Sequence, residues 1–232
     1  MSRSYKAHEQ LWMALYLKNY LSQKMEFELD IQHRRQSSPE NRLGFYEIYQ
    51  YQGYRAWLHY HVSEKLQISL SPLMYVHGVP LSEDGWGFLR EPEEEYRFSA
   101  RLENSYEHRY FDLDHRYGFE FRYRTRYEDL SYFWHEYRTR YMLRFSRKIT
   151  SNTSMEFYNE VFISFGRYIQ YNIFSENRTY LGMRRNVGDN LQIELAYMFL
   201  LEKLRSGHNY NVVNVIYVAL QFENLFHKRP VP

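Results

Sequence analysis

The chain lacks several features that would place it in a common class. It has no cysteine among its 232 residues, which excludes disulfide bonds and thiolate metal sites. It has no run of about 18 apolar residues, which excludes a transmembrane helix. The net charge is only +2, and arginine and glutamate alternate along the same segments, so the sequence offers no basic patch for nucleic acid.

A leader segment is also missing from the expected place. The opening Met-Ser-Arg-Ser-Tyr-Lys-Ala lacks the apolar stretch of a secretory signal peptide. If the protein is exported, we expect this numbering to describe a mature or truncated form. Mean hydropathy is −0.71, a value that alone would assign the chain to the soluble proteins.

Residues 116–126 show what the chain has in abundance. Their even positions are mostly charged, and their odd positions are aromatic apart from one threonine. Because side chains alternate across a strand, one face would be charged and the other aromatic. A membrane-spanning barrel turns its apolar face outward to lipid and its polar face inward to a lumen. The 19% aromatic content suits both strands and the aromatic girdles of such barrels.

The same alternation recurs in 24–34, 136–148 and 190–199. It predicts strands at 9–19, 24–35, 45–62, 66–77, 94–107, 112–128, 135–149, 154–166, 176–186, 190–203 and 210–223. Tight polar turns are predicted at 22–23, 63–65, 108–109, 150–152 and 188–190. Longer loops are predicted at 36–44, 78–93, 129–134, 167–175 and 204–209. Short turns are typical of the periplasmic side of a bacterial barrel.

The predicted fold is all-β, a transmembrane antiparallel up-and-down barrel that forms one domain over residues 1–232. Eleven segments are counted, but single-chain bacterial barrels have even strand numbers, so about 12 strands are expected, with 10–12 allowed. Pro72 lies inside one predicted strand and indicates a bulge there. Gly53 is a second candidate for a bulge.

Four short motifs resemble a known family. They are Arg-x-Gly-x-Glu-x-Arg at 116–122, Arg-Thr-Arg at 138–140, Asn-Glu-Val-Phe at 159–162 and Asn-Arg-Thr-Tyr-Leu-Gly at 177–182. The family is the Bacteroidetes-type outer-membrane family catalogued as domain of unknown function 2490, and the resemblance covers most of residues 9–226. It implies an outer-membrane β-barrel and implies no reaction. Gly118 departs from the polar residue expected at its position.

A charge network is the candidate site of the lumen. We expect it to contain Glu95, Glu103, Arg116, Glu120, Arg122, Arg124, Arg126, Arg138, Arg140, Arg144, Glu156, Glu160 and Glu194. Buried charges need partners, so the favoured interpretation is a salt-bridge network that fills and stiffens the barrel. The alternative is a charged constriction that lines a narrow pore.

Catalytic and metal chemistry have weaker support. His59, His61 and Ser63 resemble a histidine–serine pair, but they lead into a short turn, and no orienting group or oxyanion donor accompanies them. The remaining histidines are scattered without metal-ligand spacing. No catalytic residue, metal site or cofactor is therefore predicted.

The sequence thus predicts a non-enzymatic barrel of a Gram-negative outer membrane, either structural or accessory or a narrow channel. Its expected partners are the lipid bilayer and lipopolysaccharide, with no nucleic acid. Two alternatives remain: an outer-membrane lipid hydrolase, and a soluble lipocalin-like ligand-binding barrel. In the lipocalin-like barrel Tyr123 would face inward and Arg122 outward, the reverse of a membrane barrel.

Overall fold

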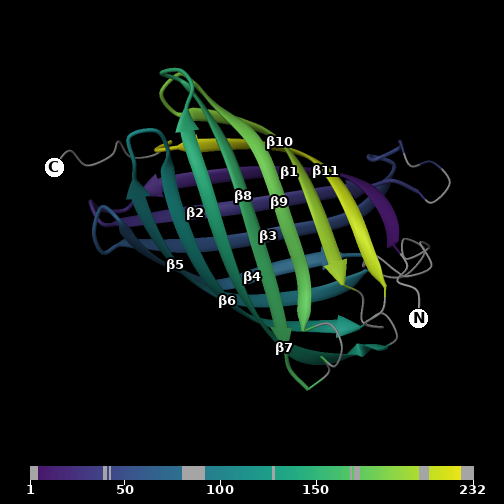
Figure 1. The fold of residues 1–232 in the computed structure, drawn as a ribbon. Helices are drawn as coiled ribbons and strands as arrows, with labels where there is room; N and C mark the ends of the chain where they lie inside the picture. Colours follow the sequence, from purple (N-terminus) through teal and green to yellow (C-terminus); the bar gives the residue numbers. More distant parts are fainter. Residues whose placement is uncertain are drawn as a thin grey trace.

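The described part of the computed structural model forms a single closed barrel (Figure 1). The structure describes residues 5–38, 41, 43–79, 92–126, 129–167, 169, 173–203 and 209–225. The strands are β1 (Tyr5–Tyr20), β2 (Met25–Gln36), β3 (Ile48–His61), β4 (Leu66–Gly78), β5 (Glu93–Glu107), β6 (Asp112–Arg126), β7 (Asp129–Lys148), β8 (Thr153–Phe165), β9 (Phe174–Val187), β10 (Leu191–Lys203) and β11 (Tyr210–Glu223). Within these ranges no helix is long and apolar enough to cross a membrane.

Consecutive strands pair in antiparallel fashion, and β1 closes the barrel by pairing with β11 in parallel. This seam runs from Tyr5 opposite Tyr210 to Lys18 opposite Glu223. The predicted all-β barrel is confirmed, with eleven described strands where about twelve were expected. An odd number is possible because the first and last strands run in the same direction and still complete a hydrogen-bonded ladder.

The five tight turns lie at one rim, as predicted, and the longer connections lie at the other. One predicted loop is wrong: residues 129–134 belong to β7, whose first residue, Asp129, pairs with Arg126 of β6. The large loop expected at 78–93 lies mostly outside the described residues.

Proline interrupts the sheet where expected, whereas glycine does not. The register between β4 and β5 shifts between Ser71 and Met74, which places a bulge at Pro72. Gly53 stays in regular register with Gln32, so the bulge considered there is not found. The alternation of inward and outward side chains continues on both sides of the Pro72 bulge.

The two faces of β6 are sorted as the sequence predicts. Phe119 and Tyr123 are 37% and 43% exposed on the outer surface, whereas Glu120 and Arg122 are only 1% and 8% exposed. Leu195 on β10 is likewise exposed. The orientation is that of a transmembrane barrel, and it is the reverse of a lipocalin-like barrel with an apolar interior.

The interior is not charged all round. Buried apolar side chains from β1, β9, β10 and β11 form one cluster. Its members are Trp12, Tyr180, Ala196, Met198, Leu200, Val213 and Val215. The lumen therefore has an apolar wall beside the seam, while most of its ion pairs lie on β5 to β9.

Candidate functional site

Ion pairs line the inner wall from β5 to β8. Arg122 of β6 contacts Glu95 of β5 at 2.5 Å and Glu136 of β7 at 2.6 Å. All three side chains are buried. Each Arg122 contact reaches a directly adjacent strand, so the guanidinium ties three neighbouring strands together.

Ion pairs around Glu120 extend this lining toward β8. Its carboxylate contacts Arg138 at 2.6 Å and Arg140 at 3.0 Å, and Arg140 also contacts Glu160 of β8 at 2.6 Å. The Glu120 side chain is only 1% exposed, and its carboxylate accepts charge-assisted hydrogen bonds from both guanidiniums. Glu120 therefore joins Arg138 and Arg140 of β7, and through Arg140 it is linked to Glu160 of β8.

A second group of pairs lies nearer the short turns. Arg144 contacts Asp114 at 2.8 Å and Glu103 at 3.4 Å, and Glu103 also holds Arg116 at 2.5 Å. On the next strands, Arg184 contacts Glu156 at 2.6 Å and Glu194 at 3.2 Å.

Nearly all the residues expected in the lumen network take part in ion pairs of this kind. They are Glu95, Glu103, Arg116, Glu120, Arg122, Arg124, Arg138, Arg140, Arg144, Glu156, Glu160 and Glu194. The side chain of Arg126 lies outside the described part. Residues of the lumen that the sequence analysis did not single out are Lys18, Arg34, Arg55, Arg97, Arg101, Asp114, Glu176, Arg178 and Arg184. The period-two rule applied to every strand would have found them.

Whether the ion pairs fill the bore depends on which strands each pair joins. Among the described residues, they join positions on one strand, on adjacent strands, or, for Arg144 and Glu103, on the two strands that flank β6. None of them connects opposite walls. The network therefore lines the wall and does not cross the lumen.

The three tryptophans that the structure describes lie inside the barrel, in contrast to the interfacial girdle expected of aromatics. Trp12, Trp57 and Trp134 are all buried. A guanidinium lies over each ring: Arg34 at 3.6 Å over Trp12, and Arg101 at 3.7 Å over Trp57. Arg124 lies 4.8 Å from the centroid of Trp134. These cation–π contacts make an indole compatible with a charged lumen.

Gly118 is explained by Arg140. The two residues face each other in the register of β6 and β7. A Cβ at position 118 would lie 2.5 Å from Cγ and 2.8 Å from Cδ of Arg140. Glycine is therefore needed so that the Arg140 side chain can pass over it to Glu120 and Glu160.

Replacing Gly118 by alanine should accordingly destabilise the barrel by about 1–3 kcal/mol, the usual cost of overpacking. The added methyl group displaces the base of the Arg140 side chain and disturbs both its ion pairs. Unfolding titrations in detergent or lipid vesicles measure the effect. In an Arg140→Ala background the same glycine substitution should cost much less, and an undiminished cost would show that Arg140 is not the cause.

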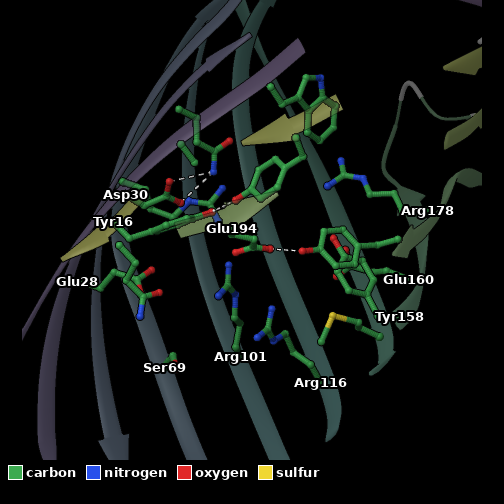
Figure 2. A pocket seen from close by; sticks show the side chains of 18 of the residues that line it. Tyr16, Glu28, Asp30, Ser69, Arg101, Arg116, Tyr158, Glu160, Arg178 and Glu194 are labelled. Atoms are coloured by element: carbon green, nitrogen blue, oxygen red, sulfur yellow. Dashed lines mark hydrogen bonds between the residues drawn. The ribbon is translucent and has the colours of Figure 1, made fainter. Parts of the chain in front are cut away.

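A cavity of about 390 Å³ lies in the middle of the lumen (Figure 2). We call it the chamber. Its described lining contains ten arginines and one lysine but six carboxylates. Carboxylates such as Glu95 and Glu120 contact these arginines without lining the chamber themselves. A solute in the chamber would therefore meet more cationic than anionic side chains.

One cluster joins the kinds of groups used by hydrolases and metal sites. His59 Nδ1 lies 2.7 Å from Ser69 Oγ, and His59 Nε2 lies 3.8 Å from Glu28 and 4.0 Å from Glu26. Two glutamates and a histidine could hold a metal ion, but Lys18 contacts Glu28 at 3.1 Å and already supplies a positive charge there.

The histidine–serine pair considered from the sequence forms differently. Ser63 Oγ accepts hydrogen bonds from the backbone amides of Lys65 and Leu66 in the turn. His59 contacts Ser69 instead. The contact between His59 and Ser69 lies inside the lumen. A lipid hydrolase would instead need its catalytic pair near the outer leaflet. The sequence could not reveal this cluster because it depends on the register between β3 and β4.

Comparison with solved structures identifies barrels of similar shape. A bacterial polysaccharide outer membrane secretin matches with a TM-score of 0.52 and 10% identity over 85% of this chain. The match covers 63% of the length of the secretin. The NanC porin matches with a TM-score of 0.48 and 9% identity, over 88% of this chain and 94% of the porin. At these identities the likeness concerns the fold alone.

Comparison with curated proteins gives no match. A family model described as a protein of unknown function, DUF2490, matches residues 9–211. This range includes all strands from β2 to β10 and most of β1, and it agrees with the resemblance carried by the four motifs. The chain belongs to the family of proteins of unknown function named DUF2490.

Proposed function

We propose that this protein is a narrow channel of a Gram-negative outer membrane that admits small hydrophilic solutes. The observation that carries the proposal is the polar chamber of about 390 Å³ inside a closed barrel. At about 30 Å³ per molecule, such a volume holds roughly a dozen waters. The exposed aromatic and aliphatic outer face supports an environment of lipid and lipopolysaccharide, with the short turns toward the periplasm.

The layout of the ion pairs favours a lined channel over the filled barrel expected from the sequence. The described ion pairs join groups on one strand or on nearby strands, so the ion pairs themselves do not connect opposite walls. Charged rings of this type set ion selectivity in pores. A structural or accessory barrel is the second candidate, because the apolar cluster beside the seam occupies part of the interior.

Enzymatic function has less support. Ser69 and His59 touch, and the described side chains around them are Gln67, Glu26, Glu28 and Trp57. These contacts include no pair of backbone donors for an oxyanion. Their place in the lumen also keeps them from acyl chains of the bilayer. The proposal therefore contains no reaction.

Planar-bilayer recording tests the channel directly. The purified wild-type barrel should give stable, small conductance steps. Replacing Glu120 by alanine removes one negative charge from the wall and should shift ion selectivity toward anions. Replacing the exposed turn residue Glu64 by alanine is the matched control and should leave the selectivity unchanged. Folded wild-type protein that gives no steps would contradict the channel and favour the structural role.

A further inference from the structure

Three arginines of the chamber have no carboxylate partner among the described residues. They are Arg34, Arg55 and Arg101, whereas every other arginine of the described lining forms an ion pair. Arg34 is stabilised in another way, because it lies over the rings of Trp12 and Tyr51 and donates to Gln32.

Arg101 lies between two very small neighbours in the wall. Its register partner on β4 is Ser69, and its partner on β6 is Gly118. Neither a hydrogen bond nor an ion pair joins the Arg101 guanidinium to another described residue, and the side chain lines the chamber. Its guanidinium therefore keeps five N–H donors on the side of the chamber that no described residue accepts.

Arg55 is buried without an oxygen acceptor. Its side chain is only 5% exposed, and its hydrogen bonds go to the sulfur of Met74, which is a weak acceptor. The guanidiniums of Arg55 and Arg101 lie 5.2 Å and 3.7 Å from the centroid of the same Trp57 ring. Two guanidiniums thus lie near each other on the Trp57 ring without an ion pair to a described residue, and an anion between them would be stabilising.

The surrounding charges restrict where an anion could lie. Arg116 and Arg101 come from adjacent strands and point into the same space (Figure 2). On the β2 side, Glu28 and Asp30 also line the chamber, with Glu28 bound to Lys18 and Asp30 bound to Gln32 at 2.9 Å. Asp30 faces Arg55 directly in the register of β2 and β3, so these carboxylates would direct an anion away from β2 and toward the guanidinium of Arg101 on β5.

We propose that Arg55 and Arg101 form an anion-binding site in the lumen, which takes a small solute bearing a carboxylate, sulfate or phosphate group. The planar donors of arginine match the oxygens of such groups in pairs. The site deepens the proposed function by naming the class of solute. Passage of the anion through the barrel rests on the proposed channel, whereas binding of the anion requires only the chamber.

Calorimetric titration of sulfate into the detergent-solubilised full chain tests the site. Sodium chloride at the same ionic strength is the reference, because sulfate also acts through general salt effects. Arg101→Met keeps an unbranched side chain against Trp57 and removes the charge, and it should weaken sulfate binding by at least about tenfold. Arg185→Gln removes an exposed arginine outside the lumen and should leave binding unchanged.

A second variant makes the result independent of one substitution. Arg55→Met should give a loss similar to that of Arg101→Met. Equal weakening in Arg185→Gln, or wild-type sulfate heats no larger than those of chloride, would overturn the site. Sulfate binding without conductance steps would contradict the channel alone, whereas steps without sulfate binding would contradict the site alone.

Discussion

Replacing Glu120 by alanine should destabilise the barrel by about 3–5 kcal/mol, as expected when one partner of a buried ion pair is removed. Glu120 is 1% exposed and contacts both Arg138 and Arg140. Arg140 retains Glu160, but Arg138 loses the only described carboxylate that it contacts. The cost therefore arises mainly from the stranded charge of Arg138.

Unfolding titrations in lipid vesicles measure this effect. Glu64→Ala, in the exposed turn between β3 and β4, removes the same charge and should change stability by less than about 0.5 kcal/mol. Glu120→Ala combined with Arg138→Met should recover much of the loss, because no unpaired guanidinium remains. If Glu120→Ala were as stable as Glu64→Ala, water in the chamber would already solvate Arg138, and the network would have no structural role.

Introducing arginine on the outer face should be almost as costly. Phe121 lies near the middle of β6, between Phe98 of β5 and Tyr137 of β7, with its ring 5.5 Å from that of Tyr137. Phe121→Arg should destabilise the barrel by about 2–4 kcal/mol if position 121 meets the bilayer midplane.

The matched control is Tyr106→Arg, close to the short-turn rim on β5 and 49% exposed. There the same charge should cost no more than about 1 kcal/mol, because it reaches the aqueous interface. Both variants are compared in lipid vesicles by denaturant titration. A cost for Phe121→Arg below about 0.5 kcal/mol would mean that this face does not contact lipid.

The sequence was sufficient to predict which side chains face the lumen, because that depends only on period-two alternation within a strand. Glu120 and Arg122 were assigned inward from neighbouring residues alone. The partners of Arg122 were not predictable in the same way. Glu95 and Glu136 become its neighbours only through the registers of β5 and β7 against β6, and these registers depend on bulges and turns elsewhere.

Two features went against general rules for physical reasons. Trp57 is buried in the lumen because two guanidiniums supply a favourable charge over its ring, an effect that outweighs the preference of indoles for the interface. The expected even strand number rested on barrels in which the closing pair is antiparallel. Here β1 and β11 close in parallel, so the parity argument does not apply.

The parallel seam also sets an order for assembly. Every other pairing in the described barrel joins strands that follow each other in the chain, so each can form as a local hairpin. The seam instead joins Tyr5 to Tyr210, and its two strands cannot meet until the intervening hairpins are in place. Until that last step, the growing sheet carries two open edges that can pair with other chains. We therefore expect closure of the seam to be the slow and aggregation-sensitive event in folding.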